Sequence, residues 1–315
     1  MAREYVQFDC GEVFSGKASG GRVNGWSEPN EYTPAYNPDY VPPTWAADLC
    51  VWFMSIKEPI YIFGPTGCGK TSCLKYLASR LNYAVYEATG HNRLEFPELV
   101  GHHTVVNGNM SYEYGPLAMA MKHGGIFLIN EVDLLDPSTA AGLNSVLDGS
   151  PLTIPENGGE IIHAHPAFRF VATANSNGAG DDTGLYQGVL RQNIALLDRF
   201  MLVKADYLSS AVETKLIQKL NPELPEDLIG KMVSFAGSVR RMFIGSEDDD
   251  DNGYKLDVTM STRTLLRWAY MTQLFSPLKA KGVNVVEYAL ERALLYRASK
   301  GGSAALREIM QRVFG

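Results

Sequence analysis

The amino-acid sequence predicts an α/β protein in which helices enclose a parallel sheet, followed by a smaller domain built only of helices. Apolar runs of strand character alternate with helical patterns from about residue 59 to residue 206, and strands separated by helices usually pair in parallel. Several of these runs end abruptly in polar residues, as buried strands do at the carboxyl edge of a parallel sheet. After residue 209 only helical patterns are found.

The 315 residues are more than one hydrophobic core usually holds, and they divide into three segments. Residues 44–206 are expected to form the α/β core and residues 207–315 a helical lid domain. Residues 1–43 are rich in glycine, proline and tyrosine and show no periodicity. This pattern predicts an extended arm laid over the core, with a mobile tail as the alternative. The aromatic residues available to pack this arm are Trp26, Tyr32, Tyr36 and Tyr40.

The composition, with 45% hydrophobic and 20% charged residues, is that of an ordinary globular protein. The net charge of −7 argues against a general attraction to nucleic acids or anionic membranes, although a local basic patch is compatible with it. The four cysteines form no C-x-x-C pair, which fits a reducing cytoplasm without structural zinc or disulfides. No apolar run reaches the ~18 residues of a membrane span, and we expect no signal peptide because the first residues lack an apolar stretch. We therefore expect a cytoplasmic protein.

The expected elements of the core follow one another at the spacing of an α/β fold. Strands are predicted at 59–63, 84–88, 125–133, 168–175 and 201–204, helices at 44–56, 72–82, 116–122 and 136–147, and hairpins around Asn107-Gly108 and Asn157-Gly158-Gly159. Helices of the second domain are predicted at 209–220, 226–243, 261–275, 284–299 and 303–313. The acidic run at 247–251 is expected to be a solvated loop.

The first strand leads into a glycine-rich turn, Gly64-Pro65-Thr66-Gly67-Cys68-Gly69-Lys70-Thr71, and a helix follows it. Glycines allow backbone amides to curl around an anion, and the new helix points its positive end at the same place. Lys70 adds a charge for the β- and γ-phosphates, and the Thr71 hydroxyl is placed to ligate Mg²⁺. This G-x-x-x-x-G-K-T pattern between strand and helix predicts a site for ATP and Mg²⁺.

The strand at 125–133 ends in Asn130-Glu131-Val132-Asp133. Downstream of a phosphate loop, Glu131 is expected to be the base that takes a proton from the attacking water. The position before it normally holds an aspartate that binds Mg²⁺, and Asn130 keeps a hydrogen-bonding oxygen there but lacks the charge. We therefore expect weaker Mg²⁺ binding, with compensation by Asp133 or a water as the alternative.

The strand at 168–175 ends in Asn175, which is expected to sense the γ-phosphate; a turn or helix cap is the alternative role. A glycine-rich loop with Asp181 and Asp182 follows, and Leu197-Asp198-Arg199-Phe200 precedes the last strand.

These motifs resemble those of AAA+ ATPases of the MoxR branch, and they are most similar to the CobS-type subunit of cobaltochelatase. The resemblance covers about residues 34–275. It is most specific in the stretch 172–186, which reads ATANSNGAGDDTGLY, and in Leu197-Asp198-Arg199. The stretch 32–40 is similar to the entry into the family's ATPase core, whereas residues 1–31 match no part of it.

The resemblance implies a ring motor of six identical subunits with ATP at the subunit interfaces. Asn175 would be sensor 1, Arg199 the arginine finger that reaches the neighbour's γ-phosphate, and Arg263 sensor 2 from the lid domain. Hairpins at 101–115 and 151–166 resemble inserts that face the pore or a partner. Relatives act with a protein bearing a von Willebrand A domain, so such a partner is expected.

Four functions compete on this basis. The first is an ATP-driven motor that remodels or activates another protein, as CbbQ or NorQ proteins do. The second is a chelatase subunit that helps to insert cobalt or magnesium into a tetrapyrrole. The third is a nucleotide-binding scaffold that hydrolyses weakly because of Asn130. The fourth, a nucleic-acid motor, is disfavoured by the acidic balance and the lack of a basic stripe.

Overall fold

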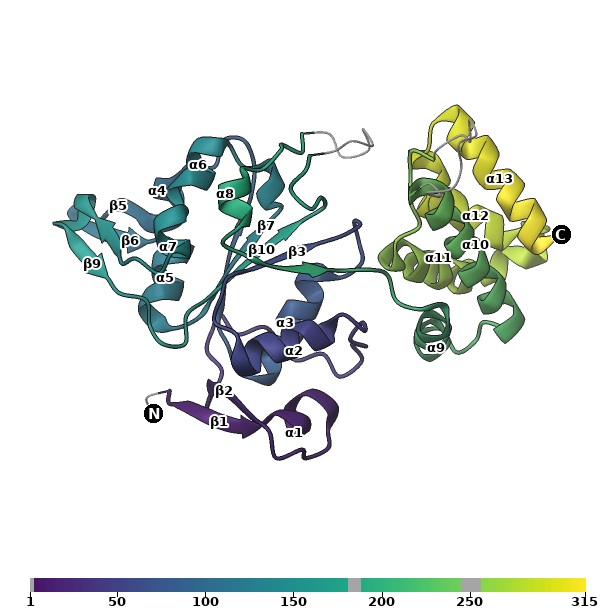
Figure 1. Ribbon diagram of the computed structural model, residues 1–315. Helices are drawn as coiled ribbons and strands as arrows, with labels where there is room; N and C mark the ends of the chain where they lie inside the picture. Colours follow the sequence, from purple (N-terminus) through teal and green to yellow (C-terminus); the bar gives the residue numbers. More distant parts are fainter. Residues whose placement is uncertain (1–2, 181–187, 245–255) are drawn as a thin grey trace. The chain divides into compact units, whose positions relative to one another are not determined.

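A computed structural model describes residues 3–180, 188–244 and 256–315 of the chain (Figure 1). The chain forms two compact units, one of Met1–Pro65 with Lys70–Asp206 and the other of Thr66–Gly69 with Tyr207–Gly315. The predicted loop acids Asp181 and Asp182 and the acidic run at 247–251 lie outside the described residues.

The first unit is built on a five-stranded parallel sheet with the strand order β11-β3-β10-β7-β4. The strands are β3 (Ile60–Phe63), β4 (Val85–Thr89), β7 (Ile126–Asn130), β10 (Arg169–Ala174) and β11 (Met201–Lys204). Every residue of the central strand β10 is buried, which explains why the strand reads as an almost continuous apolar run. The predicted α/β class is confirmed.

Helices cover both faces of this sheet (Figure 1). They are α2 (Ala46–Ser55), α3 (Lys70–Arg80), α4 (Phe96–Val100), α5 (Pro116–His123), α6 (Pro137–Gly142), α7 (Asn144–Leu147) and α8 (Ile194–Leu197). Because side chains alternate along a strand, Tyr61, Phe127 and Phe170 all point to the face covered by α4 to α7. The helix expected at 136–147 is in fact divided between α6 and α7 at Leu143, directly after Gly142, a residue that weakens helices.

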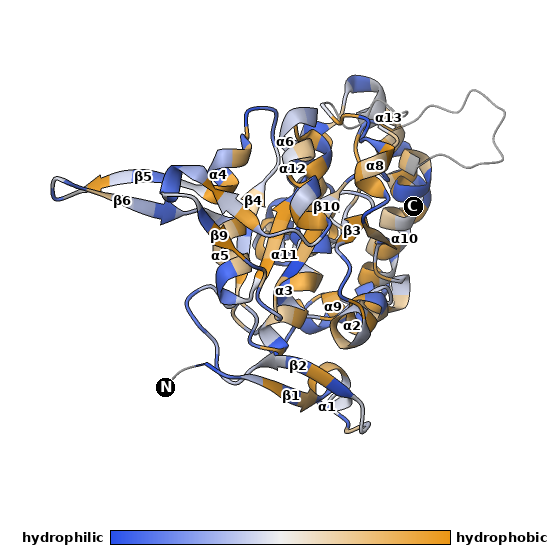
Figure 2. Cartoon of the chain, turned by 60° about the vertical axis from the view of Figure 1, so that its left-hand side comes forward, coloured by the Kyte–Doolittle hydropathy of each residue, from blue (hydrophilic) through white to orange (hydrophobic). Residues whose placement is uncertain are grey.

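Two hairpins project from the first unit, as the turn residues predict. In the first, β5 (Gly101–Val106) pairs with β6 (Asn109–Tyr114) in the register Val106↔Asn109. Its turn residues Asn107 and Gly108 have φ angles of 52° and 80°, which a tight hairpin turn requires. In the second, β8 (Leu152–Ile154) pairs with β9 (Glu160–Ile162) around the 3₁₀ turn η2 (Pro155–Asn157). Figure 2 shows the β5–β6 hairpin reaching well beyond the sheet.

The N-terminal segment is not an extended arm throughout, so that part of the prediction is wrong. β1 (Tyr5–Asp9) and β2 (Arg22–Trp26) form an antiparallel pair, with α1 (Cys10–Ser15) between them. A glycine-rich stretch connects α1 to β2. Its first residue, Gly16, ends the helix in the left-handed conformation. Five-residue strands are too short to show a periodicity that stands out among glycines, which is why the sheet was missed.

The same segment is attached to the core by aromatic side chains. The Trp26 ring, 7% exposed, donates from Nε1 to the Gly124 carbonyl at 2.9 Å. The hydroxyls of Tyr5 and Tyr83 lie 2.9 Å apart. Further along, the ring centroids of Tyr32 and Tyr86 are 4.7 Å apart, and the Val85 amide donates to the Tyr32 carbonyl. The Tyr32 contacts place this part of the chain against the edge strand β4, where unpaired backbone groups would otherwise face solvent.

Asp9 organises the N-terminal sheet by accepting hydrogen bonds from the backbone amides of Ser19, Glu12, Gly20 and Gly11. Led by the Ser19 amide, these bonds lower the pKa of the Asp9 carboxyl to about 2. A carboxylate with a lowered pKa stabilises the fold above the unfolded pKa of about 3.9, and this contribution is lost as the pH falls towards 2.

We expect Asp9→Asn to lower the melting temperature at pH 7 by a few degrees, with the difference shrinking between pH 4 and pH 2. Thermal unfolding followed by tryptophan fluorescence measures it. Glu31→Gln, which alters an exposed acid of the same segment, is the control and should leave the pH profile unchanged. A difference between Asp9→Asn and the parent that is equal at pH 7 and pH 2 would contradict the role given to the carboxylate.

The second unit is helical, as predicted, and has its own core around Phe235 and Trp268. Its helices are α9 (Ser210–Leu220), α10 (Glu226–Ile244), α11 (Thr262–Leu274), α12 (Val285–Ala293) and α13 (Lys300–Phe314), with 3₁₀ turns η3 (Ser276–Lys281) and η4 (Leu295–Arg297). The helix expected at 284–299 thus ends at Ala293. Among the described residues, no helix combines the length and apolar character needed to cross a membrane.

A buried ion pair connects three helices of this unit. Arg240 of α10 makes two hydrogen bonds to the carboxylate of Glu213 of α9, at 2.9 and 2.7 Å, and Glu213 is 1% exposed. Arg240 Nε also donates to the Met260 carbonyl, and the Thr262 hydroxyl at the start of α11 donates to Glu213 at 2.6 Å. The polar groups of both side chains are therefore satisfied, as burial requires.

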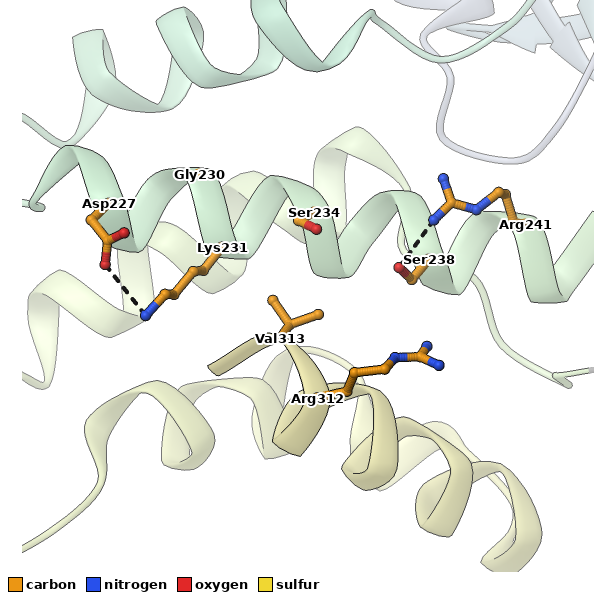
Figure 3. Close-up of a pocket in the computed structure, with 8 residues that line it drawn as sticks. All are labelled: Asp227, Gly230, Lys231, Ser234, Ser238, Arg241, Arg312 and Val313. Atoms are coloured by element: carbon orange, nitrogen blue, oxygen red, sulfur yellow. Dashed lines mark hydrogen bonds and ion pairs between the residues drawn. The ribbon is translucent and has the colours of Figure 1, made fainter. Parts of the chain in front are cut away.

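The surface of this unit carries a groove of about 710 Å³ between α10 and α13 (Figure 3). Its floor on α10 is lined by small residues one turn apart, Gly230, Ser234 and Ser238, while Arg241 and Arg312 lie at its rim. The Arg241 guanidinium donates to the Ser238 hydroxyl at 3.2 Å.

Candidate nucleotide site

The phosphate loop leaves the carboxyl end of β3 at Phe63, and α3 begins at Lys70. Gly64, Gly67 and Gly69 have φ angles of 152°, 72° and 95°, a region that side chains disfavour. A Cβ atom at Gly64 would lie 2.2 Å from the Ala205 carbonyl oxygen, so no other residue fits there without a shift. These constraints explain the glycines of the motif by local geometry.

Lys70 and Asn175 are brought together, as the sequence predicts for a phosphate-binding lysine and a γ-phosphate sensor. Lys70 Nζ donates to the Gly64 carbonyl at 2.7 Å, to the Pro65 carbonyl at 3.2 Å and to Asn175 Oδ1 at 3.1 Å. Asn175 reaches this position because β10 lies beside β3, with Ala174 opposite Phe63. The ammonium group thus stands at the carboxyl edge of the sheet, where ligands of such sheets bind.

Thr71 and Asn130, the two predicted metal-site residues, also meet. The Thr71 hydroxyl donates to Asn130 Oδ1 at 2.6 Å, and the Thr173 hydroxyl donates to the same oxygen at 3.2 Å. On the other side, Asn130 Nδ2 lies 3.5 Å from Glu87 Oε2, and Lys75 Nζ lies 2.6 Å from Glu87 Oε1.

Glu87 is a residue that the sequence interpretation missed. It lies on β4, the strand beside β7 in the sheet, and its neighbour Tyr86 points into the core. The alternation along β4 was visible in the sequence and placed Glu87 on the opposite face. The order of the strands, which puts that face next to Asn130, was not visible.

Glu131 follows β7 in a left-handed backbone conformation, with a φ angle of 55°. This conformation is uncommon for a residue other than glycine, and such residues are concentrated at functional sites. The Glu131 amide lies 3.4 Å from the Thr173 hydroxyl, and the Glu131 side chain is exposed. An exposed carboxylate at this edge of the sheet is suited to contact a water molecule.

Asp133, the alternative source of the charge that Asn130 lacks, lies in the interior of the first unit. It is fully buried, and its Oδ2 accepts hydrogen bonds from the backbone amides of Asn175 and Ser176 at 2.9 and 3.1 Å. Burial and the Asp133 carboxylate raise the pKa of Tyr61, whose hydroxyl donates to the Ser176 carbonyl. These contacts hold the turn after Asn175 in place, and they do not support compensation by Asp133 for the charge absent at Asn130.

Arg199 makes none of these contacts in the part of the chain that the structure describes. The Arg199 guanidinium forms a two-bond pair with Asp148, at 2.7 and 2.9 Å, and also donates to the Ala195 carbonyl. The hydrogen bonds between the two side chains lower the pKa of Asp148 and raise that of Arg199. Arg263 is exposed in the first turn of α11, in the second unit.

The residues present suit a nucleoside triphosphate with Mg²⁺. Lys70 and the amides of a glycine loop at a helix start are donors for phosphate oxygens. The Thr71 hydroxyl, the Asn130 amide oxygen and the Glu87 carboxylate, which the contacts bring together, are the oxygen donors that Mg²⁺ prefers. Lys70 would hold the phosphates, and Thr71 and Asn130 would hold the metal ion.

A phosphate loop between β3 and α3, with Asn175 and Glu131 after neighbouring strands of a parallel sheet, defines the fold of a P-loop nucleoside triphosphatase. Two family models match the chain: the AAA domain of the dynein-related subfamily over residues 59–200, and the CbbQ/NirQ/NorQ C-terminal domain over residues 213–313. The chain is 30% identical over 214 residues to the denitrification regulatory protein NirQ of Stutzerimonas stutzeri, a match that covers 68% of this chain and 71% of NirQ. The chain therefore belongs to the MoxR-type AAA+ ATPases of the CobS/NirQ/NorQ group.

Two further relatives agree with this assignment and confirm the resemblance found in the sequence. The aerobic cobaltochelatase subunit CobS of Sinorhizobium sp is 27% identical over 303 residues, covering 93% of this chain and 86% of CobS. Protein NorQ of Paracoccus denitrificans is 26% identical over 260 residues, covering 82% of this chain and 87% of NorQ.

The similar solved structures are remote in sequence. A mutant of RuvB from Thermotoga maritima has a TM-score of 0.48 and 15% identity, and the match covers 74% of this chain and 62% of that chain. A putative ATPase from Cytophaga hutchinsonii has a TM-score of 0.43 and 15% identity, over 82% of this chain and 84% of that chain.

Proposed function

We propose that this chain is the Mg²⁺-dependent, ATP-hydrolysing subunit of a homo-oligomeric ring, of six copies by resemblance, that remodels or activates a partner protein. The observation that carries the proposal is the convergence of Lys70, Thr71, Asn130 and Asn175 at one edge of the sheet, with Glu131 exposed beside them. This is the set of groups that ATP hydrolysis needs from one subunit.

Each residue has a defined task in this proposal. Bound ATP would supply the phosphoanhydride bond that is broken, and Mg²⁺ would neutralise part of the phosphate charge. Lys70 neutralises charge on the phosphate oxygens, and Asn175 orients the terminal phosphate. Thr71 and Asn130 bind on the metal side of the phosphates, and the carboxylate of Glu131 accepts a proton from the attacking water.

We assign Arg199 to the nucleotide site of the neighbouring subunit in the proposed ring. Arg199 lies in the same unit as Lys70, yet its guanidinium is held by Asp148 instead of joining the Lys70 contacts. The Arg199 side chain is 27% exposed and that of Asp148 49% exposed, and ion pairs open to solvent are weak enough to exchange for a stronger partner such as a phosphate. Arg263 is proposed as sensor 2.

Arg199→Ala should leave ATP binding nearly intact but reduce the hydrolysis rate by about 10³-fold or more, the range known for arginine fingers. Steady-state ATPase measurements test this. Mixing with Glu131→Gln protein should restore part of the activity, because an intact Arg199 then faces an intact site. Asp148→Ala is the matched control, since it breaks the same ion pair but keeps Arg199, and it should remain active. Loss of activity in both variants, or no recovery on mixing, would argue against the ring.

A partner protein with a von Willebrand A domain is part of the proposal. The β5–β6 hairpin exposes Val105 and Met110, 71% and 70% exposed, next to its turn, and exposed apolar side chains at a projecting tip are suited to protein contacts. Affinity capture from the native host identifies the partner; recovery of the ring alone in repeated captures would contradict this part.

The second candidate function is that of a cobalt or magnesium chelatase subunit acting on a tetrapyrrole. It is favoured by the match to CobS, which extends over 93% of this chain. Neighbouring corrin genes would support it. The weakly hydrolysing scaffold, the third candidate, rests on Asn130, and a turnover assay with Mg²⁺ decides it.

A further inference from the structure

We propose that Glu87 supplies, from the neighbouring strand, the negative charge that Asn130 lacks on the Mg²⁺ side of the site. Walker-type sites normally hold the metal with the loop threonine or serine and an aspartate at the end of the acidic strand. Here the amide of Asn130 takes that place. The proposal rests on the proposed Mg²⁺-dependent function and names a residue that this function requires.

The hydrogen bonds of Asn130 orient its amide group. Two hydroxyl donors, Thr71 and Thr173, point at Oδ1, so the oxygen faces α3 and β10. The amide nitrogen must then face the opposite way, and there it meets Glu87 Oε2 at 3.5 Å. A single amide group therefore separates the Thr71 hydroxyl from a carboxylate.

The position of Glu87 is set by the sheet and by α3. Thr89 pairs with Asn130 and Glu87 pairs with Leu128, so Glu87 is the diagonal neighbour of Asn130 on the adjacent strand. Lys75, one helical turn after Thr71, holds the other carboxylate oxygen at 2.6 Å. The side chain of Glu87 remains 36% exposed, so its carboxylate can reach the water shell of a metal ion.

The other acids nearby are less suited to this task. Asp133 is fully buried, and its Oδ2 accepts from the backbone amides of Asn175 and Ser176, while its Oδ1 has no hydrogen-bond partner among the described residues. Glu131 is assigned to the attacking water. Among the described residues, Glu87 is the acid whose carboxylate contacts Asn130 itself.

A unit negative charge close to a divalent cation changes the binding of the cation even through a layer of water, although Lys75 offsets part of the field. Glu87→Gln keeps the shape and removes the charge. It should raise the Mg²⁺ concentration for half-maximal effect on ATP affinity by about three- to tenfold. The affinity for ATP in EDTA should be unchanged or higher, because one negative charge has been removed.

The experiment measures ATP binding by calorimetry at a series of Mg²⁺ concentrations, with every protein carrying Glu131→Gln so that ATP stays intact. Asn130→Asp should lower the Mg²⁺ midpoint, and combining it with Glu87→Gln should return the midpoint to that of the parent or below. Such recovery is expected of two residues that supply the same charge. Melting temperatures without nucleotide report separately on folding.

Lys75→Met is the matched control, since it removes the ion pair but leaves the Glu87 carboxylate. Its Mg²⁺ midpoint should stay equal or fall. A midpoint raised by Lys75→Met as much as by Glu87→Gln would mean that the ion pair matters only for structure, and an unchanged midpoint in Glu87→Gln would also overturn the proposal. Failure of the proposed function looks different: ATP would then bind the parent and Lys70→Ala alike, whatever the Mg²⁺ concentration.

Discussion

Replacing Lys70 with alanine is expected to abolish tight ATP binding. Lys70 Nζ now makes hydrogen bonds to two loop carbonyls and to Asn175, and the same donors would face the phosphates of a bound nucleotide. A hydrogen bond to a charged group contributes about 1.5–3 kcal/mol, so loss of two predicts an affinity loss of roughly 10²- to 10⁴-fold.

Calorimetric titration of the folded variant with ATP measures this loss. Lys75→Ala provides the control, because it removes a lysine one turn further along the same helix. We expect it to keep most of the affinity. Unchanged ATP affinity in Lys70→Ala would refute the assignment of the phosphate loop.

Glu131→Gln is expected to keep ATP binding and to stop hydrolysis. The amide has nearly the same shape as the carboxylate but cannot accept a proton from water, and a positioned general base contributes typically about 10²–10⁴-fold to the rate. Because the substitution leaves Lys70 and Thr71 untouched, the variant should also hold the ring in its nucleotide-bound state.

The measurements are the phosphate release rate and the ATP affinity of the same preparation. Glu113→Gln, which changes an exposed acid on the β5–β6 hairpin, is the control and should hydrolyse at the rate of the parent. If Glu131→Gln itself turned over ATP at that rate, another group would have to be the base.

Much of the site could be predicted because its signals are local. The phosphate loop is one continuous stretch in which the backbone geometry requires glycine. At Gly64, for example, a side chain would collide with the Ala205 carbonyl. Asn130, Glu131 and Asn175 each stand at the end of an apolar run, and parallel strands bring such ends to one edge. The hairpin at Asn107-Gly108 could be predicted in the same way, because two adjacent residues favour its turn.

The contacts that were missed depend on which segments become neighbours. Glu87 meets Asn130 only because β4 lies beside β7, and Arg199 meets Asp148 across a separation of 51 residues. The N-terminal sheet was not predicted for another reason. Its strands are short, and its glycine-rich connection has the composition of a mobile segment.

The ion pair between Glu213 and Arg240 has a consequence for the substitutions that this chain can accept over evolutionary time. Removing one partner leaves an unpaired charge in the core of the second unit, at a cost of about 3–5 kcal/mol. Domains are stable by only about 5–15 kcal/mol, so many single replacements at either position would be lost from a population. Replacement of both by well-packed apolar residues is often neutral. Lineages should therefore keep the pair or lose both members together, and Thr262, which donates to Glu213, would be released from constraint at the same step.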